Sequence, residues 1–342
     1  MKRDHDAMLW EALSGRRVRC QLCGHECVIA AGKYGVCRVR QNVEGELKSL
    51  NYGTVVAVNV DPIEKKPLFH FLPGTLSLSV AAAGCNFQCA FCQNWQISQA
   101  PRDGLAVGGS AVSPREIVDA AVEHRCPSIS YTYTEPTVFF ELAYDTAKLA
   151  KERGLRNCFV SNGYLTPLAV QTVAPVLDAI NVDLKAFRDA TYRTVMKAHL
   201  EPVLTCLKAL VAAKVWVEVT TLVVPGMNDS PEELGDIAKF IAGELGDFVP
   251  WHISRFHGDY KMTQTPSTPL ATLAMACRLG QEAGLKYIYG GNAPGQVEEN
   301  TYCPSCHELL IERMGFGVRA NRLEDGACSK CRTRIEGIWS AK

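Results

Sequence analysis

The sequence predicts an α/β fold built around an open or partial barrel of parallel strands. From about residue 76 onward, short runs rich in β-branched residues alternate with helical stretches, which is the pattern of repeated βα units. Six or seven such units are too few to close an eight-stranded barrel. Cysteine-rich segments flank this pattern, so we expect small metal-binding appendages at the N- and C-terminal ends.

Short apolar runs give the predicted strands. They are residues 77–83, 127–134, 156–161, 179–185, 215–224, 249–256 and 286–290. Between them, Ser113, Thr166, Ser230 and Thr268 each precede a proline, and a hydroxyl followed by proline is typical of a helix start. Glutamates three residues after Ser113 and Ser230 predict capping boxes there.

The chain divides into three predicted segments. Residues 1–75 form a cysteine-rich module followed by a hairpin, residues 76–297 the partial barrel, and residues 298–342 a zinc-ribbon-like module. The hairpin ends in "DPIEKKPLFHFLPG". It either folds over the barrel mouth, with Lys65, Lys66 and His70 facing a substrate, or is a solvated hairpin, which we favour.

Composition and charge exclude several classes of protein. The chain has 36 lysines and arginines and 36 aspartates and glutamates, so it carries no excess of positive charge. Nucleic acid is therefore not an expected partner. The first twenty residues lack the apolar core of a signal peptide, and no apolar run is long enough to span a membrane. We therefore expect a cytoplasmic protein whose fifteen cysteines are not disulfides.

The cysteines at the two ends of the chain have metal-ligand spacing. Two C-x2-C pairs near the C-terminus predict a metal site, with zinc favoured over a rubredoxin-like iron, at Cys303, Cys306, Cys328 and Cys331. A less regular N-terminal group, with His25 as an alternative ligand, is Cys20, Cys23, Cys27 and Cys37. It either holds a structural metal or packs a small subdomain in reduced form. We expect four further cysteines to be buried packing residues, namely Cys126, Cys158, Cys206 and Cys277.

A third group contains only three cysteines, Cys85, Cys89 and Cys92, in the stretch "GCNFQCAFCQNW". Three thiolates can hold a four-iron cluster and leave one iron with open coordination, where a molecule can bind. The stretch follows the first predicted barrel strand. Because chemistry in such folds collects at the carboxyl ends of the strands, we expect these cysteines at the mouth of the barrel.

This C-x3-C-x2-C spacing after the first strand, with Phe91 before the last cysteine, resembles the radical SAM superfamily. The resemblance implies a partial (β/α)6-type barrel, a 4Fe-4S cluster on Cys85, Cys89 and Cys92, and S-adenosylmethionine (SAM) on the open iron. It also implies a reductant such as flavodoxin or ferredoxin. An oxidoreductase of this kind cleaves SAM reductively, and the resulting 5′-deoxyadenosyl radical abstracts hydrogen from a substrate.

Later strand exits resemble the branch that contains the pyruvate formate-lyase activating enzyme. "YTYTEP", "VSNG", "VDLK" and "RFHG" stand at the positions of that branch's motifs. The resemblance implies that the SAM-binding residues are Phe91, Glu135, Ser161, Asn162, Asp183, Lys185 and His257. Tyr133 and Thr134 replace two glycines of the branch, so a close approach of the backbone to the cofactor is in question there. Val160 replaces an aspartate, so the monovalent-cation site that some activases have at that position is also in question.

Nearly the whole chain is similar to the AmmeMemoRadiSam system radical SAM enzymes, through stretches such as "CQLCGHECVIAAGKYGVCRVR" and "HISRFHGDYKM". This resemblance implies proteins of the MEMO and AMMECR families as partners. The substrate stays open between a protein glycyl residue, as in activases of glycyl-radical enzymes, and a small molecule or protein side chain. An electron-transfer iron–sulfur protein is disfavoured, because it would need fully ligated clusters.

Overall fold

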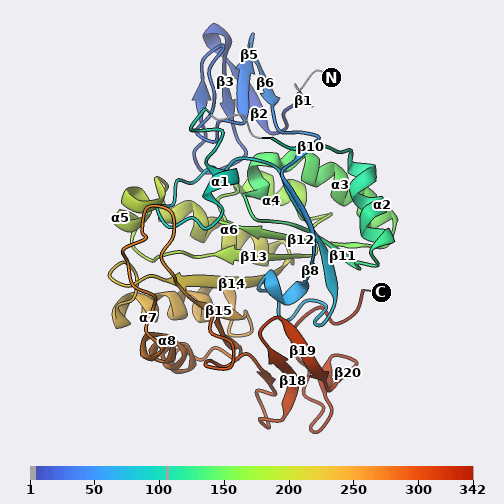
Figure 1. The fold of residues 1–342 in the computed structure, drawn as a ribbon, viewed down its shortest axis with the longest axis vertical. Coiled ribbons are helices and arrows are strands. Elements are labelled where there is room, and N and C mark those ends of the chain that lie inside the picture. Colours follow the sequence, from blue (N-terminus) through green and yellow to red (C-terminus); the bar gives the residue numbers. More distant parts are fainter. Residues whose placement is uncertain (1–4, 105–107, 342) are drawn as a thin grey trace.

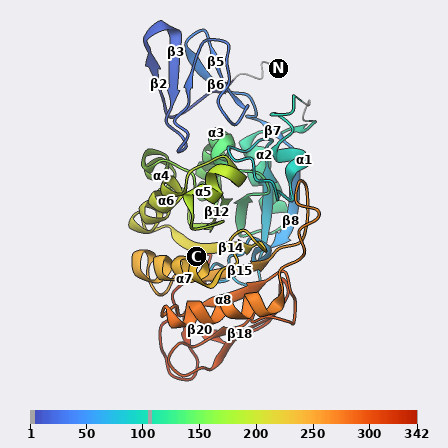
Figure 2. The same ribbon diagram turned by 90° about the vertical axis from the view of Figure 1, so that its left-hand side faces the viewer.

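The computed structural model describes residues 5–104 and 108–341. Figures 1 and 2 show the N-terminal strands at one end of the molecule, a large sheet with its helices in the middle, and the C-terminal strands at the opposite end. The two cysteine-rich modules are therefore far apart, and each packs against the central sheet from its own side.

An eight-stranded sheet, in the order β16-β15-β14-β13-β12-β11-β9-β8, forms the middle of the molecule. From β9 to β16 every neighbouring pair is parallel, while β8 is an antiparallel edge strand. The predicted α/β fold with an open parallel sheet is thus confirmed. Its strands are β8 (Ala57–Pro62), β9 (Leu76–Ala81), β11 (Ser128–Tyr131), β12 (Arg156–Ser161), β13 (Ala179–Asp183), β14 (Trp216–Val223), β15 (Trp251–Arg255) and β16 (Ile288–Gly291).

The helices that connect these strands lie along the outer side of the sheet (Figures 1 and 2). None of the helices in the described part of the chain is long and apolar enough to cross a membrane. Two short helices, α1 (Trp95–Ser98) and α5 (Asp189–Thr191), follow β9 and β13. The longer ones are α2 (Pro114–Glu123), α3 (Phe140–Glu152), α4 (Pro167–Val173), α6 (Leu200–Ala212), α7 (Pro231–Phe240) and α8 (Leu270–Glu282).

Three of the four predicted helix caps are present. Ser113 forms a full capping box, and the hydroxyls of Thr166 and Ser230 accept a backbone N–H in the first turns of α4 and α7. The capping box predicted at Ser230 is wrong, because the Glu233 carboxylate accepts from the Phe187 N–H at 2.6 Å instead. The prediction for Thr268 is wrong, because α8 begins after Pro269 without a side-chain cap. The Thr268 hydroxyl instead donates to the Val223 carbonyl at 2.6 Å, and joins two strand ends.

The segment before the predicted barrel contributes more than expected. Strand β8 lies before residue 76 and pairs with β9 along its whole length. We predicted that the segment after β8 is a solvated hairpin. This prediction is wrong, since Lys66 and His70 are 2% and 0% exposed. Lys66 donates to Asp61 at 2.7 Å, which fixes this turn against the sheet. The three-segment division of the chain stays a prediction.

The N-terminal module consists of two small sheets, with β1 (His5–Asp6), β6 (Glu46–Ser49) and β5 (Arg40–Val43) in one, and β2 (Trp10–Leu13), β3 (Arg17–Cys20) and β4 (Val28–Ile29) in the other. A two-stranded pair, β7 (Thr54–Val55) with β10 (Ser110–Ala111), lies beside it. The buried guanidinium of Arg40 donates to Glu141 of α3, so an ion pair in the interior attaches the module to the barrel.

The C-terminal module is attached through a second buried cation. It contains β17 (Thr301–Tyr302), β18 (Leu309–Met314), β19 (Gly317–Asn321), β20 (Leu323–Glu324) and β21 (Ala327–Cys328). Arg313 of β18 donates to the Phe69 carbonyl at 2.8 Å and lies over the Phe69 ring. His70 contacts the Glu336 carbonyl through Nδ1 and the Tyr289 hydroxyl through Nε2, both at 2.6 Å.

We expect His70 to make the protein less stable in mild acid. Burial lowers the pKa of His70 from 6.5 to about 4. As the pH falls below 6.5 the unfolded chain takes up this proton and the folded chain does not, so stability is lost between pH 6.5 and 4 by up to about 1.4 kcal/mol per pH unit. Urea unfolding at several pH values measures this slope. His70→Gln should flatten it, whereas His124→Gln, at an exposed position, should leave it unchanged.

Candidate active site

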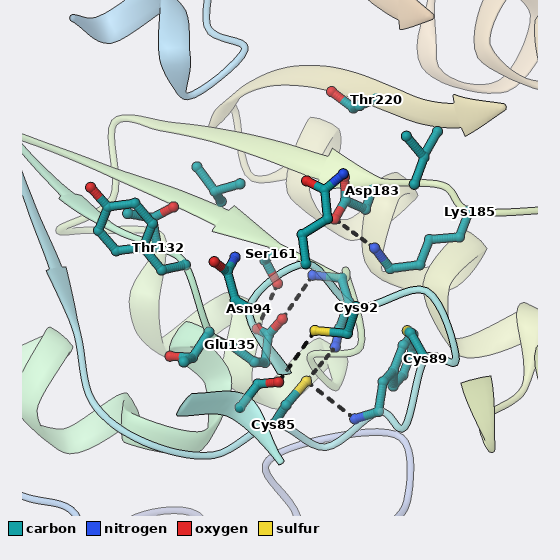
Figure 3. Close-up of a pocket in the computed structure, with 18 of the residues that line it drawn as sticks. Cys85, Cys89, Cys92, Asn94, Thr132, Glu135, Ser161, Asp183, Lys185 and Thr220 are labelled. Atoms are coloured by element: carbon teal, nitrogen blue, oxygen red, sulfur yellow. Dashed lines mark hydrogen bonds and ion pairs between the residues drawn. The ribbon is translucent and has the colours of Figure 1, made fainter. Parts of the chain in front are cut away.

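A pocket of about 520 Å3 opens at the carboxyl ends of the parallel strands (Figure 3). It brings together residues from the loop after β9 and from the ends of the strands that follow. The predicted site residues that line it are Cys85, Phe91, Cys89, Cys92, Glu135, Ser161, Asn162, Asp183 and Lys185. Sequence positions about one hundred residues apart thus meet in one cavity.

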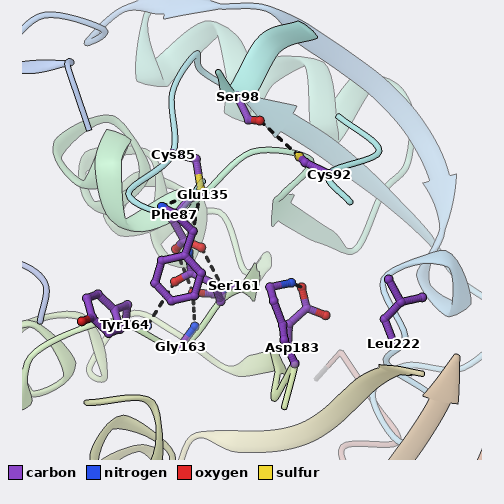
Figure 4. Close-up of polar contacts among 12 residues, drawn as sticks. Cys85, Phe87, Cys92, Ser98, Glu135, Ser161, Gly163, Tyr164, Asp183 and Leu222 are labelled. Atoms are coloured by element: carbon purple, nitrogen blue, oxygen red, sulfur yellow. Dashed lines mark hydrogen bonds and ion pairs between the residues drawn. The ribbon is translucent and has the colours of Figure 1, made fainter. Parts of the chain in front are cut away.

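The loop that carries the three cysteines is held by its aromatic residues. Phe87 and Phe91 are 1% and 4% exposed and pack into the core beneath the loop. The Phe87 N–H donates to Cys85 Sγ at 3.3 Å, and Cys92 Sγ shares a hydrogen bond with the Ser98 hydroxyl of α1 at 3.3 Å (Figure 4). Burial raises the pKa of the Cys89 thiol to about 12. A bound metal would therefore have to displace its proton.

The three thiols of this loop are not gathered as tightly as the C-terminal cysteines. One tetrahedral zinc holds its sulfurs about 2.3 Å from the metal and hence about 3.8 Å from one another. The described residues include all fifteen cysteines, and among them only the C-terminal group gathers three or more ligand atoms within 4.8 Å. The three thiols lie in one pocket, and three is the number of thiolates that leaves one iron of a four-iron cluster open.

Glu135 is the best-anchored acid of the pocket. It is 1% exposed, and its Oε1 accepts from the Ser161 hydroxyl at 2.8 Å and from the Thr137 hydroxyl at 2.6 Å. Its Oε2 accepts from the Asn162 N–H at 2.8 Å (Figure 4 shows this turn from Glu135 to Gly163). Burial raises the pKa of Glu135 although these donors oppose the shift. The carboxylate is thereby fixed in one orientation.

Tyr133 stands in the place of a glycine in the related branch and adopts a backbone conformation that favours glycine. Its φ is +62°. For a bulky residue this conformation costs about 1–3 kcal/mol and persists where its surroundings impose it. Here the Tyr133 hydroxyl donates to Asp61, and the Lys66 ammonium lies 4.5 Å from the ring centroid. The chain therefore preserves the glycine-like turn without the glycine.

Asp183 and Lys185 form an ion pair of 2.7 Å at the end of β13 (Figure 3). Burial opposes the charge on Lys185, but Asp183 and Cys89 hold the pKa of the lysine above its ordinary value. The ammonium lies 5.9 Å from the Phe91 ring centroid. A permanent cation beside the cysteine loop is suited to hold a carboxylate or ribose hydroxyl.

His257 is not part of the pocket lining. Its Nε2 accepts a hydrogen bond of 2.9 Å from Gln93, and Gln93 does line the pocket. The Trp95 and Tyr260 rings stack next to this contact, with centroids 5.1 Å apart. His257 thus lies beside the pocket and contacts the lining residue Gln93.

Several lining residues escaped the sequence analysis. They come from strands β14 and β15 or from flanking segments, and they include Thr132, Thr220, Leu222, Ser254, Asn292 and Phe316. Of the three residues predicted to face a substrate if the hairpin covers the mouth, Lys65 and Lys66 line the pocket and His70 does not. The Thr220 hydroxyl is buried without a hydrogen-bond partner and lies at the pocket (Figure 3). An unsatisfied hydroxyl at a cavity is the kind of group that a polar ligand completes. The signal for Thr220 was weak, because it lies inside an apolar strand pattern.

The C-terminal cysteines form a compact group as predicted. The Sγ atoms of Cys303 and Cys331 are 3.5 Å apart, and those of Cys306 and Cys328 are 3.7 Å apart. All four sulfurs lie within 4.8 Å of one another. These distances are close to those around one tetrahedral metal ion. Of the four isolated cysteines, Cys126, Cys158 and Cys206 are buried as predicted, and Cys277 is only half-buried.

The four N-terminal cysteines line a second, smaller cavity, together with His25 and Arg40. His25 donates through Nε2 to the Asn86 carbonyl at 2.9 Å. This contact places the N-terminal module directly against the loop of the central three cysteines.

Comparisons with known proteins agree with this geometry. The family model of the radical SAM superfamily matches residues 80–241, which span the cysteine loop and the strands up to β14. The chain belongs to the radical SAM superfamily. An uncharacterized protein of Methanocaldococcus jannaschii is 47% identical over 333 residues, which cover 97% of this chain and 98% of that protein.

Relatives whose names state a function are more distant. The pyruvate formate-lyase-activating enzyme of Clostridium pasteurianum is 22% identical over 197 residues, which cover 52% of this chain and 79% of that enzyme. The crystal structure of a radical SAM methyltransferase from Sphaerobacter thermophilus has a TM-score of 0.51 and 14% identity, over 65% of this chain and 68% of that one. The latter likeness concerns the fold alone. Membership in this superfamily implies a 4Fe-4S cluster, SAM and a reductant.

Proposed function

We propose that this protein is a radical SAM enzyme whose 5′-deoxyadenosyl radical removes a hydrogen atom from a protein glycyl residue. The observation that carries the proposal is the set of three thiols facing a pocket that Glu135, Asp183 and Lys185 also line. A 4Fe-4S cluster bound to Cys85, Cys89 and Cys92 would supply one electron to the SAM sulfonium, whose cleavage gives methionine and the radical.

The protein residues have separate tasks in this proposal. Glu135, held by Ser161 and Asn162, orients the cofactor's amino group with its fixed carboxylate. The Asp183–Lys185 pair binds the methionine carboxylate and the ribose. Thr220, with its unpaired hydroxyl, lies on the side away from the cysteine loop and contacts the adenosyl part. Phe91 shields the cluster from water.

The glycyl substrate is supported by similarity to an activating enzyme. A second candidate, a small molecule or a protein side chain, is favoured by Lys65 and Lys66, which line the pocket from outside the βα units. Both ammonium groups pair with Asp61, so an anionic group of a substrate would have to share them with that carboxylate. We further propose that the protein acts in the AmmeMemoRadiSam system with MEMO- and AMMECR-family partners, on the strength of the stretches quoted above.

We also propose that Cys303, Cys306, Cys328 and Cys331 bind zinc as a structural ribbon. The support is their compact arrangement, in which four thiolates would fill the coordination sphere of a tetrahedral ion. Zinc is redox-inactive, so this site would stabilise the module and take no part in electron transfer.

Isotope transfer tests the function. Protein reconstituted without oxygen is given SAM and dithionite, and 5′-deoxyadenosine is measured by mass spectrometry. We expect it to form, and to gain deuterium when extract from cells grown in deuterated water is added. Deuterium that comes only from the fraction retained by a protein-excluding membrane supports a protein substrate, at a glycyl residue or a side chain, and deuterium from the filtrate supports a small molecule. Absence of 5′-deoxyadenosine under all conditions would contradict the function itself.

A further inference from the structure

The four N-terminal cysteines share a feature with the central three that the C-terminal group lacks. In the C-terminal group, Sγ atoms contact each other at 3.5 and 3.7 Å. Cys20, Cys23, Cys27 and Cys37 line one cavity, yet three of their sulfurs do not come within 4.8 Å of one another, since only the C-terminal cysteines meet that limit among the described residues. The N-terminal four and the central three are thus gathered less tightly than the C-terminal group.

The cavity also supplies hydrogen-bond donors to sulfur, as protein sites of iron–sulfur clusters do. The Val36 N–H donates to Cys27 Sγ at 3.5 Å, and Arg40 Nη1 donates to Cys20 Sγ at 3.4 Å. The central site has the same kind of contact, from the Phe87 N–H to Cys85 Sγ. Arg40 is 2% exposed and also pairs with Glu141, so its guanidinium joins that carboxylate to Cys20 Sγ inside the protein.

His25 does not compete with the cysteines as a ligand through Nε2, because that nitrogen donates to the Asn86 carbonyl. Four cysteines line the cavity, which is the number that completes a 4Fe-4S cluster and leaves no open iron. Such a cluster transfers electrons and does not bind SAM. This distinguishes the N-terminal site chemically from the central one.

Asn86 connects the two cysteine sites. It follows Cys85 directly in the chain, its side chain lines the N-terminal cavity, and its Nδ2 is buried without a hydrogen-bond partner. Its Oδ1 accepts from Asn162 Nδ2 at 2.7 Å, and the same Asn162 nitrogen lies 3.8 Å from Cys85 Sγ. One asparagine thus contacts the cavity on one side and the pocket on the other.

Two more contacts hold the sites together. Arg102 donates through Nη2 to the Val36 carbonyl at 2.9 Å and to the Cys85 carbonyl at 3.2 Å. The Tyr164 ring lies between His25 and Phe87, with centroids 4.9 Å from each (Figure 4 shows Phe87 and Tyr164 below Cys85). The N-terminal module is therefore in direct contact with the reactive loop.

The outer side of the module is suited to a transient protein contact. Val28, Tyr34 and Val36, next to Cys27 and Cys37, are 51%, 43% and 37% exposed. Exposed apolar residues grouped around a site mark interaction surfaces. Two cations accompany them, since Lys33 and Arg38 are also exposed. An acidic electron carrier would complement this surface, and redox contacts of this kind are small and short-lived.

We propose that Cys20, Cys23, Cys27 and Cys37 hold a second 4Fe-4S cluster, which takes electrons from an acidic carrier such as a reduced flavodoxin or ferredoxin and passes them to the central cluster. One electron moves at a time: the carrier is oxidised by one electron, the N-terminal cluster is reduced and then reoxidised, and the central cluster is reduced. The relay rests on the proposed function, whereas the presence of the second cluster does not.

Iron and sulfide content, with Mössbauer spectra, tests the second cluster on protein reconstituted anaerobically. We expect about eight irons per chain in the wild type, and about four both in Cys23→Ser/Cys27→Ser and in Cys85→Ala/Cys89→Ala/Cys92→Ala. About four irons in the wild type, with none in the triple variant, would overturn the proposal. So would zinc that is lost with Cys23 and Cys27. The wild-type value decides the question even if the N-terminal variant fails to fold.

The relay is tested by stopped-flow reduction of the central cluster, which needs no turnover of substrate. Lys33→Glu/Arg38→Glu should keep both clusters and slow reduction by flavodoxin about tenfold or more, with the dithionite rate unchanged. Arg193→Glu, at an exposed position on the barrel, is the matched control and should not change either rate. Equal flavodoxin rates in wild type and the Lys33/Arg38 variant would show that electrons enter elsewhere.

Discussion

Cys89→Ala is expected to abolish the formation of 5′-deoxyadenosine from SAM. Cys89 is one of three thiols on the loop after β9, and no fourth cysteine lines the pocket. Its loss leaves two ligands for a cluster that already has one open corner, so the central cluster should not assemble. Product is measured by mass spectrometry after reduction with dithionite, and the central cluster by its spectroscopic signal with and without SAM.

Cys277→Ala is the matched control for this prediction. Cys277 lies on α8, is half-buried and does not line the pocket. It should retain wild-type product and cluster content, with at most a small loss of stability from the removed sulfur. Product from Cys89→Ala at the wild-type rate would contradict the assignment of the central thiols.

Much of the barrel could be predicted because its elements are locally encoded. The seven predicted runs coincide with β9 and β11 to β16, since strands buried on both faces give short continuous apolar stretches. Ser113, Thr166 and Ser230 mark helix starts by hydroxyl and proline chemistry that depends only on adjacent residues. Thr268 has the same local pattern, but its hydroxyl donates to the Val223 carbonyl, which is distant in sequence, and does not cap the helix.

The burial of the segment after strand β8 could not be predicted from the sequence. "DPIEKKPLFHF" is charged enough to suggest exposure, yet Glu64 and Lys66 are 1% and 2% exposed. Asp61 neutralises Lys66, and the Gly74 N–H donates to Glu64. Buried charges need partners that lie far apart in sequence or across a turn. Such pairing could not be deduced from the charge pattern alone.

Some residues of the candidate site could be predicted from the sequence, and others could not. Residues on strand exits, such as Glu135 and Asp183, have polar side chains just after apolar runs and could be identified one by one. Phe316 could not, because it reaches the pocket from the C-terminal module, which lies beyond the barrel in sequence. The pocket is therefore a product of all three parts of the chain, and its substrate specificity need not follow that of relatives that share only the barrel.

Cys303→Ser is expected to destabilise the C-terminal module strongly while leaving SAM cleavage intact in the protein that remains folded. Cys303 is fully buried, and its Sγ lies 3.5 Å from that of Cys331. Structural zinc contributes about 10 kcal/mol or more to the folding of small metal modules, so the loss of one ligand should lower the melting temperature clearly. Thermal unfolding and zinc content measure the effect, with Met314→Ser, at an exposed position of β18, as the control.

The same variant separates two roles of the module. SAM should still be cleaved, because Cys85, Cys89 and Cys92 lie on the loop after β9 and are not part of the C-terminal module. Hydrogen transfer to substrate should become less coupled to this cleavage, because Phe316 between β18 and β19 lines the pocket and would lose its support. The ratio of 5′-deoxyadenosine formed to deuterium gained measures this coupling. An unchanged melting temperature together with unchanged zinc content would contradict a structural metal at these four cysteines.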